Sequence, residues 1–356
     1  MKNFIISGIQ QMGIGVANTN EAFAWYRKNF GMDIKVFEEA ATAEYMLPYT
    51  GNKPQKRHAI LAINIQGGGG FEIWQYTERT PQAPATTPQL GDLGIYLCKM
   101  KTFDVNATHK RFAGAGLKVS EIYQDPTGKH HFFVTDPYNN TFQFVECGKK
   151  FTEDKKDNGG VHGAFVGVSD IDKALKVYSD ILGYNRVIYD VKGSFSEFSY
   201  MNAGSKQFRR VLLTSHNERS GPFSKLFGKS EIELVQALDG PAKKIFDGRF
   251  WGDLGFIHLC FDMQGFLELE QYCIAANRPF TVNSLQKLNS SFDMGEAAGH
   301  FSYIEDPDGA LIEFVETHKL PILKKFGWYL DLTKRPHGTR LPDWIIRAMR
   351  FSRVKN

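Results

Sequence analysis

The sequence has few cysteines and no motif that would pair them. Its 356 residues include only Cys98, Cys147, Cys260 and Cys273, and no two of them form Cys-x-x-Cys. This spacing excludes a zinc ribbon and a thioredoxin-type redox motif. We expect four reduced thiols, as is usual in a cytoplasmic protein.

Long apolar runs and a strong excess of one charge are also missing. No stretch approaches the roughly 20 apolar residues that span a bilayer, and the N-terminus lacks the apolar run of a signal peptide. The formal net charge is only +4, and much of the excess lies near the C-terminus. The nearly neutral body argues against a nucleic-acid partner. The composition therefore predicts a cytoplasmic protein without a membrane span.

What the sequence does contain is an internal repeat. Residues 306–316 begin with Asp-Pro-Asp-Gly and continue as an alternating apolar strand, and residues 136–146 repeat this pattern without gaps. Asp-Pro starts a tight turn, and alternation with period two is typical of a strand. Glu313 of one copy is replaced by Gln143 in the other. A carboxylate between apolar neighbours is costly without a partner, so Glu313 is a candidate functional residue.

The repeat extends to whole units. Tyr-x-x-x-x-Gly ends a predicted helix at Tyr26–Gly31 and again at Tyr178–Gly183, and Gly-Asp-Leu-Gly opens two further units at 91–94 and 252–255. We interpret the chain as four β-α-β-β-β units in two pairs, an α+β fold. Each pair is expected to form a cupped, mixed-sheet half-barrel with its helices outside.

A charged, glycine-ended segment at residues 148–160 is typical of a domain boundary. We therefore expect one domain at residues 1–150 and a second at 158–318, each made of two consecutive units. Residues 319–356 lie outside the repeats and form a basic, aromatic C-terminal extension.

The four units, the Tyr-x-x-x-x-Gly helices and the closing Asp-Pro strands resemble the vicinal oxygen chelate superfamily over about residues 8–318. This group includes glyoxalase I, bleomycin-resistance proteins and extradiol dioxygenases. The resemblance implies metal ligands early in the first strand of a unit and at the glutamate of its last strand. The residues at these slots are Gln11 and Glu72, Tyr96 and Gln143, Gly163 and Glu233, and His258 and Glu313.

Among these slots, His258 and Glu313 carry the best ligands. Divalent iron, manganese or nickel binds imidazole and carboxylate groups that project into one cavity with open positions left for substrate. Four of the expected ligand positions hold residues that bind a metal ion weakly or not at all: Gln11, Tyr96, Gln143 and Gly163. We therefore expect the metal in the second domain and a metal-free first domain. Glu72 has no histidine partner in its own half, so we interpret it as structural or as a polar contact in an empty cavity.

The third metal ligand is left open between His162 and Glu233. His162 precedes Gly163 and faces the cavity only if a bulge turns it inward. In that case His162, His258 and Glu313 would form the two-histidine, one-carboxylate triad of non-haem iron(II) oxygenases. Glu233 would then be an acid or base. Otherwise Glu233 would itself join His258 and Glu313, in a more glyoxalase-like arrangement.

The resemblance and these ligands indicate a metal-dependent enzyme, with Fe(II) favoured and Mn, Ni or Zn as alternatives. We expect a dioxygenase acting on a small oxygenated substrate, either aromatic or a keto acid. His300 and Tyr303 are further candidate catalytic residues that would face the substrate. Two alternatives remain open: a glyoxalase-like lyase or isomerase in which Glu233 or Glu313 moves a proton, and a metal-free binding protein. The oligomeric state is also left open, with a homodimer as one alternative.

Overall fold

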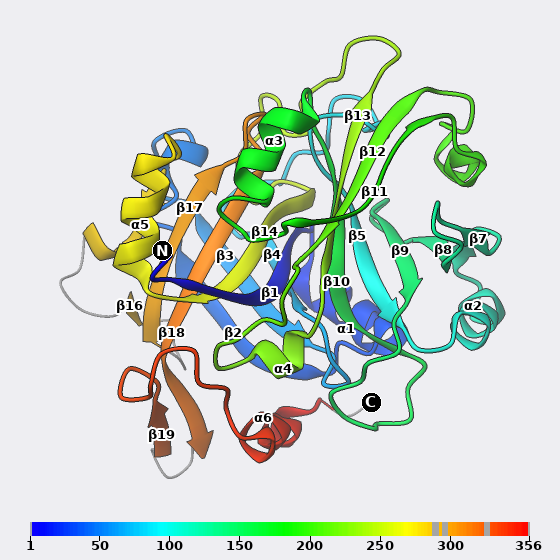
Figure 1. Cartoon of the computed structure of the whole chain (residues 1–356). Coiled ribbons are helices and arrows are strands. Elements are labelled where there is room, and N and C mark those ends of the chain that lie inside the picture. Colours follow the sequence, from blue (N-terminus) through cyan, green and yellow to red (C-terminus); the bar gives the residue numbers. More distant parts are fainter. Residues whose placement is uncertain (1, 287–291, 294–297, 324–327, 355–356) are drawn as a thin grey trace.

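The computed structural model describes residues 2–286, 292–293, 298–323 and 328–354. Two large mixed sheets lie at the centre of the molecule, and the few helices lie outside them (Figure 1). The predicted α+β fold of paired units is therefore confirmed. No helix within the described residues is long and apolar enough to cross a membrane.

Sheet A contains strands from both ends of the chain. Its order is β15-β17-β18-β14-β1-β4-β3-β2, with β16 paired to β17 and β19 to β18. The bounds are β1 Ile5–Gly15, β2 Ile34–Thr42, β3 Lys56–Ile63, β4 Gly70–Tyr76, β14 Gly255–Gln264, β15 Val282–Asn283, β16 Phe292–Asp293, β17 Ala298–Glu305, β18 Leu311–Leu323 and β19 Trp328–Asp331.

Sheet B contains strands from the middle of the chain, in the order β11-β12-β13-β10-β5-β9-β8-β6, with β7 paired to β8. The bounds are β5 Gly94–Thr102, β6 Lys118–Val119, β7 Tyr123–Gln124, β8 His130–Thr135, β9 Thr141–Glu146, β10 Asn158–Gly167, β11 Arg186–Gly193, β12 Phe208–Thr214 and β13 Glu231–Ala237. The helices are α1 Thr19–Phe30, α2 Val105–Gly114, α3 Ile171–Tyr178, α4 Ser224–Phe227, α5 Phe266–Ala275 and α6 Asp343–Ala348.

The pairing of the units differs from the expected one. In each sheet two units join through their antiparallel first strands, β1 with β14 in sheet A and β5 with β10 in sheet B. In Figure 1 the blue β1 accordingly lies beside the yellow β14. The first unit therefore shares a sheet with the fourth, and the second with the third. The expectation that consecutive units share a sheet was wrong, because the repeat marks where each unit begins but not which edge its first strand joins.

Consecutive units meet instead through their helices. The Tyr26 hydroxyl on α1 donates a hydrogen bond to Asp136 Oδ2 in the second unit, at 2.5 Å. The Tyr178 hydroxyl on α3 likewise donates to Asp306 Oδ2 in the fourth unit, at 3.0 Å. The two motifs that repeat in the sequence therefore bind each other. Phe30 adds apolar contact in the first pair, with its ring 5.0 Å from that of Phe142.

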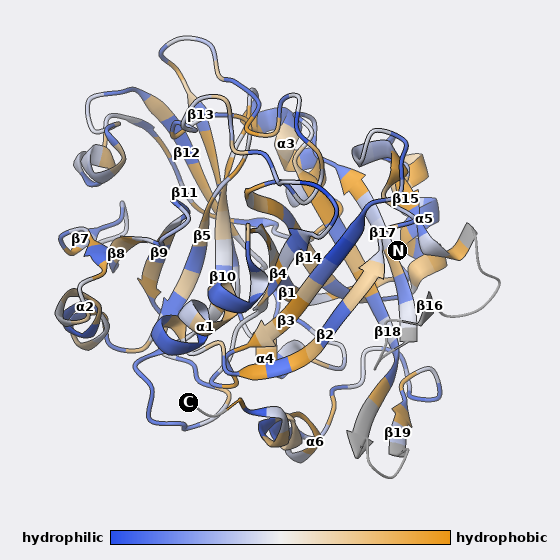
Figure 2. Cartoon of the chain, turned by 180° about the vertical axis from the view of Figure 1, so that it is seen from behind, coloured by the Kyte–Doolittle hydropathy of each residue, from blue (hydrophilic) through white to orange (hydrophobic). Residues whose placement is uncertain are grey.

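The C-terminal extension covers one end of sheet A. Leu341, Ile345 and Ile346 of the extension are buried with Ile34 of β2 and Phe223 in one apolar cluster. Apolar residues also follow the strands of both sheets (Figure 2). Because burial of such side chains is the main favourable contribution to folding, the extension is an integral part of this domain and not a free tail.

Candidate metal centre

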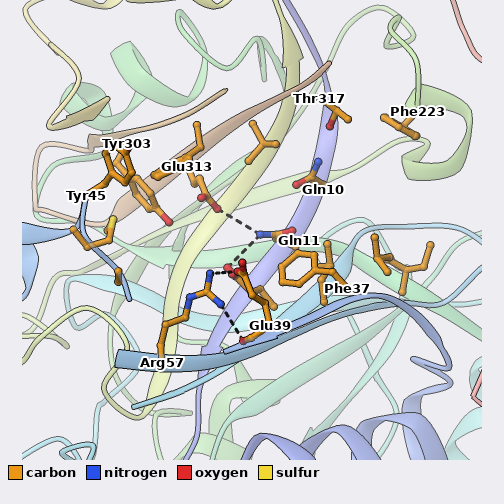
Figure 3. Close-up of a pocket in the computed structure, with 18 of the residues that line it drawn as sticks. Gln10, Gln11, Phe37, Glu39, Tyr45, Arg57, Phe223, Tyr303, Glu313 and Thr317 are labelled. Atoms are coloured by element: carbon orange, nitrogen blue, oxygen red, sulfur yellow. Dashed lines mark hydrogen bonds and ion pairs between the residues drawn. The ribbon is translucent and has the colours of Figure 1, made fainter. Parts of the chain in front are cut away.

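Four polar side chains converge at the centre of sheet A. They are Gln11 on β1, Glu72 on β4, His258 on β14 and Glu313 on β18. His258 Nε2 lies 3.0 Å from Glu313 Oε2 and 3.3 Å from Glu72 Oε2. Gln11 Nε2 donates to Glu72 Oε2 at 3.3 Å and to Glu313 Oε2 at 3.5 Å, and Figure 3 shows Gln11 pointing toward Glu313. The cluster therefore draws two residues from the first unit and two from the fourth.

Strand register explains why these side chains meet. Gly13 of β1 lies opposite His258 in the antiparallel pairing and opposite Glu72 in the parallel one. A β-carbon at Gly13 would lie only 2.4 Å from Cε1 of the His258 ring. The missing side chain therefore leaves the space that the imidazole occupies, between the carboxylates of the neighbouring strands.

The cluster concentrates negative charge in a buried place. His258 is fully buried, and burial alone would lower its pKa. The carboxylates of Glu313 and Glu72 outweigh this effect and raise the pKa of His258 to about 9. Two carboxylates that share one buried site stabilise a positive charge between them, which is the electrostatic requirement for a cation site.

The donor set also fits a divalent metal. The ligand atoms of Glu72, His258 and Glu313 all lie within 4.8 Å of one another, and this is the one such group of three or more residues within the described chain. Gln11 Oε1 and His258 Nδ1 are buried and form no hydrogen bond with the described residues. One imidazole nitrogen with carboxylate and amide oxygens is a suitable set for a first-row divalent cation.

Aromatic rings surround the cluster. Trp251 stacks on His258 with ring centroids 6.1 Å apart and an interplanar angle of 10°. Tyr303 meets the same ring edge-on, at 5.6 Å and 90°. Burial holds the pKa of Tyr303 well above its ordinary value, so its hydroxyl stays protonated. A cavity of about 200 Å³ opens beside Glu72, Glu313 and Tyr303 and provides room for a substrate.

Of the residues singled out in the sequence, the structure brings His258, Glu313 and Tyr303 together. Glu72, which was interpreted as structural, lies 3.3 Å from His258 and completes the carboxylate pair. Glu72 lies at one of the predicted ligand positions, but the first unit was expected in a separate sheet from His258 and Glu313. The misassigned pairing alone therefore explains why its role was missed.

His162 and Glu233 lie in sheet B, away from this cluster. His162 Nε2 is 3.4 Å from Glu231 Oε1. Glu233 is held by two cations, Arg210 at 2.6 Å and Lys99 at 3.3 Å. Because the third unit pairs with the second, neither residue can reach His258. The two-histidine iron triad and the alternative set with Glu233 are therefore not assembled.

His300 also lies outside the cluster. Although it is on β17, like Tyr303, its ring packs against His318 with centroids 4.6 Å apart. It lines a different cavity with Glu316 and Phe266. Tyr303 lies three positions after His300, and side chains along a strand alternate between its two faces, so the two side chains point to opposite faces of the sheet.

Comparisons with known proteins agree with this architecture. Residues 8–144 match the sequence model of the Glyoxalase/Bleomycin resistance protein/Dioxygenase superfamily. This first part of the chain is therefore similar in sequence to that superfamily. The matched segment holds the first two units, and similar solved structures extend the same fold to the others. No curated protein sequence matches the chain.

Two solved structures illustrate the shared fold. Glyoxalase I from Zea mays superposes with a TM-score of 0.51 at 11% identity, over 87% of this chain and 92% of its own. A putative dioxygenase from Bacillus subtilis gives a TM-score of 0.55 at 14% identity, over 88% of this chain and 86% of its own. At these identities the likeness establishes the fold, and the chemistry must be argued from the site.

Proposed function

We propose that this chain is a metal-dependent enzyme of the glyoxalase type, which moves a proton between neighbouring carbons of a substrate with two vicinal oxygens. The observation that carries the proposal is the composition of the cluster: one imidazole with two carboxylates. The facial triad of iron oxygenases has two imidazoles and one carboxylate. The ligands therefore favour the lyase or isomerase alternative over the dioxygenase. A buried cluster of this charge is also unexpected in a metal-free binder.

In this proposal His258, Glu72, Glu313 and Gln11 hold the cation, which when bound supplies Lewis acidity to the vicinal oxygens of the substrate. The donor set suits Fe(II), Mn, Ni and Zn alike, so reconstitution with each ion is the way to identify it. Trp251 and Tyr303 pack around His258 and exclude water from this side of the centre.

Glu313 is the proposed proton carrier. It lines the cavity and touches both His258 and Gln11. Its carboxylate accepts the proton from the hydroxyl-bearing carbon beside the substrate carbonyl; the electron pair of that C–H bond forms a C=C bond, and the π pair of the carbonyl moves to its oxygen. The same carboxylate then returns the proton to the former carbonyl carbon, while the hydroxyl proton passes to the oxygen of that carbon and the carbonyl re-forms on the other carbon. Atoms and electrons balance within the substrate, so no oxidant is needed.

The test separates proton transfer from oxygen chemistry. The metal-loaded protein is incubated anaerobically in deuterium oxide with an α-hydroxyketone, and NMR follows deuterium incorporation at the carbon. We expect exchange in the wild type and a loss of at least about 100-fold in Glu313→Gln, by the usual size of general-base effects. Glu268→Gln, an exposed change on α5, should retain the wild-type rate.

Three other results would each contradict the proposal. Oxygen uptake with catechols or keto acids, without deuterium exchange, would support the dioxygenase. A wild-type protein that takes up no metal after anaerobic loading would support the metal-free binder. Unchanged exchange in Glu313→Gln would move the proton-carrier role to Glu72, whose carboxylate lies 3.3 Å from His258 Nε2.

A further inference from the structure

The cavity beside the metal cluster has a largely apolar wall built from distant parts of the chain. Phe37 and Leu61 come from β2 and β3, Phe223 and Phe227 from the region of α4, and Leu320 and Met349 from the C-terminal extension. The volume of about 200 Å³ exceeds the roughly 150 Å³ of an apolar cavity that holds benzene. An apolar group of ring size or larger therefore fits beside the cluster.

The charged groups of the wall are mostly acidic. Besides Glu72 and Glu313, the described lining residues include Glu39 and Glu44, and Arg57 is the one cation among them. Arg57 is already bound: its Nη2 lies 2.6 Å from Glu39 Oε2, and its Nη1 donates to the Glu39 carbonyl oxygen at 3.1 Å (Figure 3). The wall therefore offers no uncommitted positive charge to an anionic group.

From this wall we infer that the substrate is an uncharged molecule with an apolar, ring-sized body and vicinal oxygens at one end. The inference rests on the proposed function and narrows its substrate class. A keto acid or any other substrate with a remote carboxylate would bring that charge into an apolar wall whose one described cation, Arg57, is already paired with Glu39. Burying an unpaired charge is costly, and a site discriminates against ligands whose charge it leaves without a partner.

A matched pair of chelating ligands tests this inference. 4-Methylcatechol and 3,4-dihydroxybenzoate present the same vicinal oxygens, but only the second carries a carboxylate. Each is titrated anaerobically into metal-loaded protein, with tryptophan fluorescence as the signal because Trp251 lines the cavity and stacks on His258. We expect the neutral ligand to bind at least about tenfold tighter.

Glu39→Gln provides the decisive variant, because it releases Arg57 from its carboxylate partner. The preference for the neutral ligand should narrow or reverse in this variant. Arg57→Met, which removes the cation, should not improve binding of the carboxylate ligand. Glu39 and Arg57 both keep some solvent exposure, with side chains 31% and 15% exposed, so these variants are expected to fold.

The outcomes distinguish this inference from the proposed function. Metal uptake is measured first, and a wild type that binds no metal overturns both proposals. A metal-loaded wild type that binds 3,4-dihydroxybenzoate as well as or better than 4-methylcatechol overturns the substrate class alone. So does a metal-loaded protein that binds neither ligand. A preference that Glu39→Gln leaves unchanged also overturns the substrate class, because the inference assigns the preference to the pairing of Arg57 with Glu39.

Discussion

Sheets A and B share one architecture but differ at their centres. In sheet A, His258 lies opposite Gly13 across the two first strands. At the equivalent point of sheet B, Leu97 lies opposite Phe165. The other positions differ as well: Gln11, Glu72 and Glu313 of sheet A correspond by register to Gly163, Glu233 and Gln143 of sheet B. At these positions sheet B therefore keeps one carboxylate, has an amide in place of the second, and has no imidazole.

The remaining carboxylate of sheet B is neutralised by side chains. Arg210 and Lys99 both pair with Glu233. By strand register, Arg210 corresponds to Ala59 of sheet A, and Lys99 corresponds to Cys260. Sheet A has no lysine or arginine at those two positions beside its carboxylates. In both sheets a positive charge therefore lies beside the buried carboxylate: Arg210 and Lys99 supply it in sheet B, whereas in sheet A the imidazolium of His258 supplies it and, in our proposal, a metal ion replaces that proton.

The largest expected effect comes from removing the cation of sheet B. Arg210 is fully buried and bridges Glu233 and Glu197, each at 2.6 Å. Arg210→Ala leaves both carboxylates with less compensation, and we expect the free energy of unfolding to fall by about 3–5 kcal/mol. Denaturant unfolding measures this loss.

Arg209→Ala is the matched control on the same strand. Arg209 pairs with Asp190 and Asp172, which are 43% and 71% exposed, so its removal should cost under about 1 kcal/mol. Equal losses in the two variants would show that burial of the sheet B pair has no special role.

The next prediction makes sheet A resemble sheet B. His258→Leu introduces the residue type that sheet B has at Leu97. We expect metal affinity to fall at least about 100-fold, the upper range found when even outer-shell partners are lost. Equilibrium dialysis with metal analysis measures the affinity. Metal should also stabilise the wild type by about 2.7 kcal/mol at 100 times its Kd, and this variant by no more than about 0.4 kcal/mol at the same concentration.

His300→Ala is the control, because His300 lies on the same sheet but outside the cluster. It should bind metal as the wild type does. Loss of metal from His300→Ala, or retention by His258→Leu, would refute the assignment of the centre.

The sequence was sufficient to predict the units and part of the site. The Asp-Pro repeat identified the last strands, and with them Glu313. The second Gly-Asp-Leu-Gly motif ends three residues before His258. The same motif in the second unit ends three residues before Leu97, so the sequence already indicated Leu97, and not Tyr96, as the equivalent residue. The strand register shows the same correspondence.

The rest depended on contacts between units, which a repeat cannot reveal. The four first strands each mix apolar with small or polar residues, and that pattern does not specify that β1 joins β14 rather than β5. Glu72 meets His258 and Glu313 only because β1 pairs with β14. The pairing of Glu233 with Arg210 also follows from register, since the two residues lie 23 positions apart on different strands. Local pattern thus predicts candidate ligands, whereas tertiary pairing decides which of them converge.

A smaller effect concerns the pH dependence of sheet B. Burial is the main cause that raises the pKa of Glu197 from 4.5 to about 6, against the opposing effect of Arg210. The folded state therefore binds a proton more tightly than the unfolded state does. The contribution of Glu197 to stability should fall as pH rises from about 4.5 to about 6, and stay constant above that range.

Glu197→Gln removes this titration. The difference in unfolding free energy between wild type and variant should therefore change by up to about 2 kcal/mol between pH 4.5 and pH 7, in the direction that disfavours the wild type at higher pH. Denaturant unfolding at both pH values measures it. The exposed change Glu121→Gln should follow the wild-type profile, and a parallel profile in Glu197→Gln would contradict the prediction.

The smallest expected difference lies in the two tyrosine bonds, each of which joins a helix beside one sheet to a turn of the other. Asp136 Oδ2 also accepts a bond from Asn140 at 3.0 Å, whereas Asp306 Oδ2 has no second donor among the described residues. Tyr178→Phe should therefore cost about 2 kcal/mol and Tyr26→Phe about 1 kcal/mol. Burial raises the pKa of Asp306 to about 6, so the cost of Tyr178→Phe should grow above that pH, where the bond would be to a charged carboxylate. Denaturant unfolding of both variants at pH 5 and pH 8 tests this order. A larger cost for Tyr26→Phe would show that the second donor at Asp136 does not replace the lost hydroxyl.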